Sequence, residues 1–271
     1  MGSAAHHSLT PENLRIRDNF DAIAPRYDLT NRVISFGVDL HWRRVAVRQL
    51  GDLGPDAVVL DLACGTCDMA LEVLRQRRAA RIIGADLSEK MLDLARRKLA
   101  AKGLIGGPGS NVGPGPARIE LVTAPAEALP FRDASFDGIT IAFGIRNVPD
   151  YRQGLREMLR VLKPGGRACI LEFSAPPSRL LWRLYNYYFF NVLPRVGGWL
   201  TGREAAYRYL TESVAQFPGA AEFAAAMEDA GFAPVTRLAM NGGIVCVHTG
   251  TKPADSAPAT RPGGARAVAA P

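Results

Sequence analysis

The residues best suited to chemistry in this 271-residue chain stand where an apolar run passes into a helical pattern. The segment 58–71, VVLDLACGTCDMAL, carries Cys64 and Cys67 at the spacing of a redox dithiol or of half a zinc site. Its turn of small residues around Gly65 is also typical of a loop that lets the backbone approach a nucleotide closely. Asp61 and Asp68 flank this turn. The segment therefore predicts either thiol chemistry or a nucleotide site.

The cysteines by themselves give little support to thiol chemistry. Zinc needs two further ligands, but Cys169 and Cys246 are isolated in the sequence and no His-x-x-His pair occurs, so we expect no metal. A helix N-terminus would favour the thiolate of a redox dithiol, but this interpretation explains no residue outside the segment. Four unevenly spaced cysteines in a chain of this length do not form a disulfide framework, so we expect reduced thiols.

The nucleotide interpretation accounts for a residue outside the segment. Asp86 ends the next predicted strand, where a carboxylate can accept hydrogen bonds from both hydroxyls of a ribose. A dinucleotide would need more glycines in the turn, and Asp61 and Asp68 would repel its pyrophosphate. These acids suit a ligand that carries an ammonium and a sulfonium group as well as a ribose. We therefore predict a site for S-adenosylmethionine.

The elements that must position these residues alternate between apolar strands and amphipathic helices, which predicts a doubly wound α/β fold. The predicted helices are 13–24, 29–36, 40–49, 68–77, 89–101 (with Ser88 as N-cap), 151–162 and 223–230, and the seven predicted strands are 57–62, 81–86, 118–122, 136–142, 167–173, 232–238 and 244–248. Continuously apolar strands indicate a mostly parallel sheet that is covered on both faces. Asn241-Gly242-Gly243 joins the last two strands and predicts an antiparallel edge hairpin. In such a sheet the ligand lies beyond the carboxyl ends of the strands.

Composition indicates one domain with low-complexity segments at its ends and in its middle. We predict a disordered lead over 1–10, a single domain over 11–251 and a disordered tail over 252–271, because the ends cannot bury enough apolar surface to order themselves. Within the domain we predict an N-terminal helical cap over 11–50. A Gly- and Pro-rich insertion follows at 103–116 and an aromatic-rich insertion at 178–202.

Charge and hydropathy bear on location and partners. The formal net charge of +7 favours anionic partners, among them the anionic surface of a membrane, and no nucleic-acid module is evident. The chain has no apolar run of about 18 residues and no signal-peptide core, so we expect a cytoplasmic protein, with peripheral membrane contact as an option. The segment 180–200 holds 7 of the 21 aromatic residues and would line a lipid tunnel, rest on a bilayer or pack as a helical insertion. The oligomeric state stays open, with a homodimer as one candidate.

Longer motifs resemble the ubiquinone/menaquinone biosynthesis C-methyltransferase family, in order, over residues 12–252. They are YDLTNRVISFGVDLHW (27–42), AEALPF (126–131), TIAFGIRNVPDY (140–151), RVLKPGGRACILEFS (160–174), YRYLTESVAQFPG (207–219) and GGIVCVHTG (242–250). The resemblance implies the Rossmann-like class I methyltransferase fold and C-methylation of a prenylated quinol with S-adenosylmethionine. The motifs NVPDY and QFPG resemble the menaquinone branch, which implies conversion of demethylmenaquinol to menaquinol. The alternatives are the polyprenyl methoxybenzoquinol precursor of ubiquinone, another hydrophobic small molecule, an RNA, and a quinone-binding protein that has lost catalysis.

The resemblance also implies which residues hold the cofactor. Gly65 and Thr66 would line its methionine end, and Asp61 would meet the ammonium through water or cap N–H groups of the loop. Asp86 would hold the ribose. The remaining implied contacts are Leu87, Pro125, Ala126 and Ala142. The chain departs from the family at two of these places and at Cys67 beside the loop: Cys67 stands where Gly or Ala is usual, Pro125 where Asp or Asn could bond the adenine amino group, and Ala142 where Ser is common.

Three candidate catalytic residues follow from the same resemblance: Arg146, Asn147 and Tyr27. Methyl transfer to a ring carbon requires close in-line positioning and a path for the quinol proton. Arg146 is too basic to take that proton, so we expect it to stabilise a developing quinolate or to orient a water. The alternative is that Arg146 pairs with a carboxylate and Tyr27 packs within the cap.

Overall fold

A seven-stranded sheet forms the centre of the molecule, with the strand order β3-β2-β1-β4-β5-β7-β6. The computed structural model describes residues 9–24, 28, 31–32, 35, 37–76, 81–105, 119–176, 178, 180, 183, 186–188, 191, 195 and 204–254. The strands are β1 (Val58–Leu62), β2 (Arg81–Asp86), β3 (Ile119–Thr123), β4 (Phe136–Ala142), β5 (Leu162–Phe173), β6 (Val235–Met240) and β7 (Val245–Thr251). Strands β1 to β5 are parallel, whereas β7 runs antiparallel to both β5 and β6. The predicted mostly parallel sheet with an antiparallel edge hairpin is therefore confirmed.

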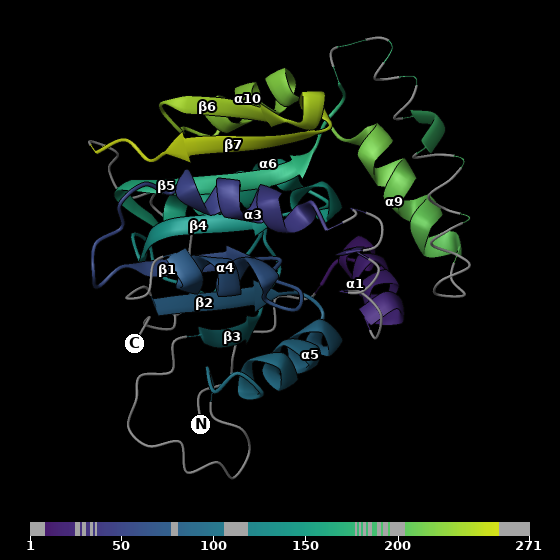
Figure 1. Cartoon of the computed structure of the whole chain (residues 1–271). Helices are drawn as coiled ribbons and strands as arrows, with labels where there is room; N and C mark the ends of the chain where they lie inside the picture. Colours follow the sequence, from purple (N-terminus) through teal and green to yellow (C-terminus); the bar gives the residue numbers. More distant parts are fainter. Residues whose placement is uncertain are drawn as a thin grey trace.

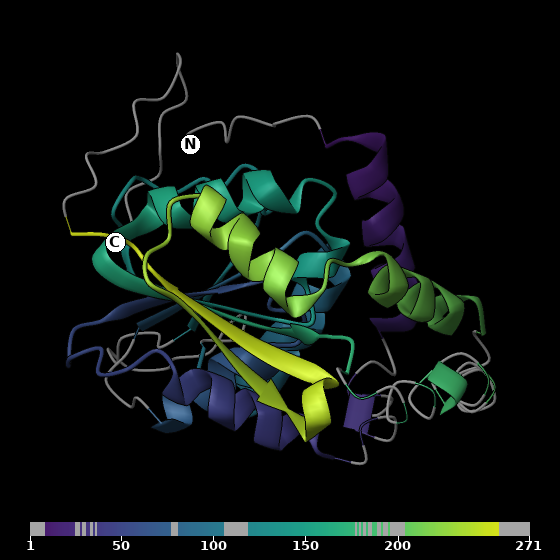
Figure 2. The same cartoon turned by 90° about the horizontal axis from the view of Figure 1, so that it is seen from above.

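Helices cover both faces of this sheet (Figure 1, Figure 2). They are α1 (Pro11–Ile23), α3 (Asp39–Arg48), α4 (Asp68–Gln76), α5 (Glu89–Ala100), α6 (Tyr151–Val161), α9 (Glu204–Gln216) and α10 (Ala220–Asp229). Helices α3, α4 and α5 bury apolar side chains with one face of the sheet, and α6 and α10 do so with the other. Each face therefore has its own hydrophobic core, which explains why the parallel strands are apolar throughout.

Helices α1 and α9 lie side by side beyond the edge at which the parallel strands end (Figure 1, Figure 2). Helix α1 begins with a cap, because the hydroxyl of Thr10 accepts a hydrogen bond of 3.1 Å from the N–H of Asn13. At the start of α5 the side chain of Ser88 accepts from the N–H of Met91, which confirms the predicted N-cap. Helices α1 and α9, called the two cap helices below, therefore lie at the edge of the sheet where a ligand is expected.

Several boundaries differ from the sequence-based expectations. Helix α9 lies in a stretch for which no element was predicted, and β5 begins at Leu162, directly after α6, so the Lys163–Gly166 turn signal falls within the assigned strand. The disordered tail was expected from Lys252, but Lys252 is buried and its ammonium donates to the carbonyl of Leu162 at 2.8 Å. That bond ties the end of β7 to the start of β5. Most of each predicted insertion, 103–116 and 178–202, lies outside the described residues.

Candidate active site

The loop after β1 closes through a hydrogen bond to the end of β2. The N–H of Gly65 donates to Asp86 Oδ2 at 2.8 Å, and the N–H of Ser88 donates to Asp86 Oδ1 at 2.8 Å. Gly65 has a φ of 54°, in the left-handed region that glycine adopts without a Cβ clash. Burial raises the pKa of Asp86, although these N–H donors oppose the shift. Each carboxylate oxygen keeps a lone pair for a further donor, which is what a ribose diol would need.

Asp61 lies near the end of β1, and its carboxyl faces the start of α4. Its Oδ2 accepts from the N–H of Ala70 at 2.9 Å and its Oδ1 from the hydroxyl of Thr140 at 2.9 Å. The carboxyl therefore caps a helix N-terminus, which is one of the two roles the sequence allowed. Burial raises the pKa of Asp61 to about 7, against the opposing effect of the bond from Thr140.

This shift predicts a pH dependence of stability. The folded-state pKa of Asp61 lies above the ordinary value of 3.8, so the folded chain binds more protons than the unfolded chain between pH 4 and pH 7. Its contribution to the free energy of unfolding is full at low pH and falls by roughly 1.4 kcal/mol per pH unit across that window. We expect urea unfolding of Asp61→Asn to lack this fall, since the amide does not titrate. Parallel stability profiles of the variant and the original chain between pH 4 and pH 8 would contradict the assignment.

Two cavities adjoin at this edge of the sheet. The larger holds about 680 Å³ of empty space, including its open mouth. Predicted cofactor residues line it, namely Gly65, Asp86, Leu87, Pro125, Ala126 and Ala142. The smaller cavity is lined by Asp61, Thr66, Asp68 and Arg43, and it shares Ala63, Gly65 and Ala142 with the larger one. All eight predicted cofactor residues therefore surround one continuous region, although they come from four segments of the chain.

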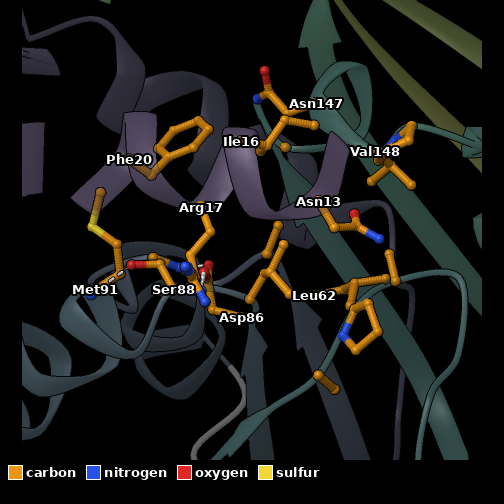
Figure 3. Close-up of a pocket in the computed structure, with 18 of the residues that line it drawn as sticks. Asn13, Ile16, Arg17, Phe20, Leu62, Asp86, Ser88, Met91, Asn147 and Val148 are labelled. Carbon is orange, nitrogen blue, oxygen red and sulfur yellow. Dashed lines mark hydrogen bonds between the residues drawn. The ribbon is translucent and has the colours of Figure 1, made fainter. Parts of the chain in front are cut away.

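Helix α1 forms a wall of the larger cavity that was not predicted at residue level. Asn13, Ile16, Arg17 and Phe20 line the cavity from one side of the helix, opposite Asp86, Ser88 and Met91 (Figure 3). Their spacing of three or four residues is that of a single helix face. The amphipathic spacing of residues 13–20 is the feature of the sequence that indicates such a face. The pattern cannot distinguish a face that packs on a core from a face that lines a cavity.

The polar rim of the smaller cavity is a network of ion pairs. Arg32 binds Asp39 and donates to Asp68 at 2.8 Å. Lys98 bridges Asp68 Oδ1 at 2.6 Å and Asp28 Oδ2 at 2.7 Å. Burial alone would raise the pKa of Asp68, but Arg43, Lys98 and Arg32 hold it below its usual value. The hydroxyl of Thr66 donates to Asp28 Oδ1 at 2.5 Å, so this hydroxyl already has a partner.

The cysteines lie behind the loop. Cys67 is fully buried, lines neither of these two cavities and has a φ of 68°. Its thiol is therefore not part of the lining of either cavity. The left-handed backbone gives a physical reason for glycine at this position in the family, because a Cβ is disfavoured there. Cys64 is also buried, and its pKa is raised well above the ordinary value by a hydrogen bond with Cys67 and by burial, which is opposite to what a reactive thiolate needs.

The candidate catalytic residues separate into three cases. Asn147 lines the larger cavity, and its Oδ1 accepts from the hydroxyl of Tyr209 on α9 at 3.2 Å. Arg146 lies behind the wall: its Nη1 binds Glu172 Oε1 at 2.7 Å, and the two side chains are 6% and 1% exposed. In the structure Arg146 therefore pairs with a carboxylate, which is the alternative that the sequence left open for this residue. Tyr27 lies outside the described residues. Tyr209 was not predicted, because its helix was not.

The fold and this site together define a class I S-adenosylmethionine-dependent methyltransferase. A solved structure with the same architecture is the Haemonchus contortus phosphoethanolamine N-methyltransferase 2 in complex with S-adenosyl-L-methionine. It matches with a TM-score of 0.56 at 14% identity, over 79% of this chain and 52% of that one. The donors and acceptors present here fit the same cofactor: acids beside a small polar cavity suit an amino-acid group, and Asp86 beside a larger apolar cavity suits a nucleoside.

The chain belongs to the ubiE/COQ5 methyltransferase family, whose model matches residues 9–252. A relative from Geobacter sulfurreducens, named ubiquinone/menaquinone biosynthesis C-methyltransferase, is 49% identical over 91% of each chain. A demethylmenaquinone methyltransferase from Thermus thermophilus is 44% identical over 86% of this chain and its own full length. The predicted family, enzyme class and cofactor are confirmed, and S-adenosylmethionine is the methyl donor. Within the described residues no helix is long and apolar enough to cross a membrane, and no cluster of His, Cys, Asp and Glu could hold a metal.

Proposed function

We propose that the protein methylates the ring carbon of demethylmenaquinol to give menaquinol. The observation that carries the proposal is the likeness, over nearly the whole chain, to relatives named for quinone C-methylation, two of them demethylmenaquinone methyltransferases. The cavity supports it, since its larger part is lined mainly by apolar side chains and has helix α1 as one wall. A flat apolar ring could lie there beside the methyl donor.

We propose that Asp86 holds the ribose, Leu87 and Pro125 the adenine face, and the Ala126 N–H the adenine edge. Gly65, Thr66 and Ala142 would line the methionine end. When bound, S-adenosylmethionine supplies an electrophilic methyl group, and the chain must align the ring carbon with it and carry away one proton. Near-attack alignment can supply much of the rate.

Asn147 is the described candidate that can touch the ring. Its carboxamide lines the cavity and is held by Tyr209 on one side and by the carbonyl of Phe143 at 3.4 Å on the other. It can donate to an oxygen of the quinol and so orient the hydroxyl that loses its proton to water or to a base. Arg146 is then a positioning residue, since its bonds to Glu172 and the Phe143 carbonyl hold the loop that carries Asn147. The role of Tyr27 stays a prediction.

The alternative substrate is the polyprenyl methoxybenzoquinol precursor of ubiquinone. The deciding experiment incubates the purified protein with labelled S-adenosylmethionine and, separately, demethylmenaquinol or the ubiquinone precursor. We expect label in the naphthoquinol product. Transfer to the benzoquinol alone would favour the alternative, and transfer to neither ring would overturn the proposal.

A prenylated substrate resides in a lipid phase, so we propose that the protein meets the membrane from its surface. Leu180 and Tyr187, in the aromatic-rich segment, are 69% and 66% exposed, and the chain carries a net charge of +7. Basic side chains near an anionic bilayer contribute on the order of 1 kcal/mol each. Flotation with vesicles that contain an anionic lipid tests this contact, and equal recovery with neutral vesicles would argue against the electrostatic part.

A further inference from the structure

One arginine of the cap stands on the buried side of its helix. Helix α3 buries Asp39, Trp42, Arg43, Ala46 and Val47, which follow one another at the spacing of a single face. Four of these positions belong to the hydrophobic core or to the ion-pair network around Arg32. The side chain of Arg43 is only 8% exposed, whereas that of its neighbour Arg44 is 44% exposed. A charged group in this setting is costly unless something pairs with it.

The guanidinium of Arg43 is paired only loosely at its Nε, through a long ion pair with Asp39. Its Nε is buried and makes no hydrogen bond. The closest carboxylate oxygen, Asp39 Oδ2, lies 3.7 Å from Nε, beyond hydrogen-bond distance, and is already bound by Arg32. The other contact is a cation–π contact, with the guanidinium carbon 5.5 Å from the ring centre of Phe143. Unbonded buried donors of this kind point to a ligand that completes them.

Arg43 faces the place where an amino-acid group would bind. It lines the smaller cavity together with Asp61, Gly65, Thr66 and Asp68, and among the described residues that line this cavity it is the only cation. The cavity continues into the larger one at Gly65, beside the bond to Asp86. A ligand that places its ribose at Asp86 therefore has its amino-acid end in reach of Arg43.

The charges around this end complement both groups of an amino acid. The pKa of Asp68 is held below its usual value, so its carboxylate suits an ammonium, whereas the guanidinium of Arg43, with an Nε that makes no hydrogen bond, suits a carboxylate. A guanidinium offers several donors in a plane and binds carboxylates through two hydrogen bonds. A lysine would offer only a point charge at that depth.

We propose that Arg43 binds the α-carboxylate of the methionine moiety of S-adenosylmethionine. Arg43 is thereby a specificity residue that separates the complete cofactor from adenosyl thioethers without the carboxylate. The inference rests on the proposed function only in requiring this cofactor, and it does not depend on which quinol is methylated.

The test is a two-by-two comparison of binding by calorimetry, with no methyl transfer. The ligands are S-adenosylhomocysteine and its decarboxylated analogue, which keeps the amine but lacks the carboxylate. The proteins are the original chain and Arg43→Met, with Arg44→Met as the matched control one residue along the same helix. We expect the original chain to bind the complete ligand about 10- to 100-fold more tightly than the analogue, the range of a charged hydrogen-bonded pair. In Arg43→Met this preference should vanish, and in Arg44→Met it should stay.

Either of two results would overturn the inference: an original chain that binds both ligands equally, or an Arg43→Met variant that keeps the full preference. Circular dichroism checks that the variant folds, and Arg43→Lys, expected to keep part of the preference, replaces it if it does not. Without a variant, the ligand comparison on the original chain can still overturn the inference, whereas assigning a preference to Arg43 requires one of the two substitutions. A preference for the carboxylate together with failed quinol methylation would sink only the proposed substrate. Quinol methylation with no preference would sink only the role of Arg43.

Discussion

Replacing Glu172 with alanine is expected to lower the free energy of unfolding by about 3–5 kcal/mol, the largest effect of any single change considered for this protein. Glu172 is fully buried, accepts from Arg146 Nη1 at 2.7 Å and also from the N–H of Phe173 at 2.8 Å. Its removal leaves the Arg146 guanidinium, itself only 6% exposed, without its counter-charge. Urea unfolding followed by circular dichroism measures the loss.

The control is the double variant Arg146→Met with Glu172→Met. A buried ion pair costs desolvation energy that its attraction barely offsets, so apolar side chains of similar volume should restore most of the stability. Methyl transfer should stay impaired in the stable double variant, because the loop before Asn147 has lost its bond from Arg146 to the Phe143 carbonyl. If the double variant is as unstable as Glu172→Ala, the cost lies in packing and the charge argument is wrong. If its transfer rate is normal, Arg146 does not position Asn147.

The second large effect is expected on cofactor affinity. Asp86→Ala removes the acceptors proposed for the ribose, and hydrogen bonds to a charged group are worth about 1.5–3 kcal/mol each. We therefore expect the dissociation constant of S-adenosylhomocysteine to rise about 100-fold or more in calorimetry. Part of this loss comes from the loop, because Asp86 also accepts from the N–H groups of Gly65 and Ser88.

Two further variants separate these contributions. Asp86→Asn keeps one carbonyl oxygen for the loop but loses the charge, so its affinity should fall between those of the original chain and Asp86→Ala. Asp93→Ala changes an acid on α5, the helix that follows Asp86. The side chain of Asp93 is 57% exposed, so this variant should bind the cofactor product with unchanged affinity. An unaltered dissociation constant in Asp86→Ala would contradict the ribose assignment.

The sheet and the loop could be predicted because local chemistry decides them. Five apolar runs separated by helical patterns define parallel strands, and the acid that ends a strand must lie at the carboxyl edge of the sheet whatever the details of packing. The sequence therefore predicts that Gly65 and Asp86 share this edge of the sheet, and in the structure a hydrogen bond joins them. The edge hairpin followed from its short Gly-containing connection, because only antiparallel neighbours can be joined so directly.

The cap could not be predicted to the same depth. Helices α1, α3 and α9 present polar residues on faces that a sequence pattern assigns to solvent or core. Whether Asn13 lines a cavity, or Arg43 is buried, depends on what other segments cover them. Tyr209 reaches Asn147 across a separation of 62 residues, and no periodicity reports such a contact.

The amino-acid sequence by itself determined the class of fold, the strand that carries the loop, the position of Asp86 at the end of the next strand and the membership of a quinone methyltransferase family. These properties are local, because residue type, spacing and turn chemistry act within one or two elements. Only the tertiary structure decided that Arg146 is bound by Glu172, that Cys67 lies behind the loop and that Arg43 is buried beside the cavity with an Nε that makes no hydrogen bond. The physical reason is that burial and charge pairing are set by neighbours from distant parts of the chain. The free energy of a charged or polar group depends on those neighbours more than on its own identity.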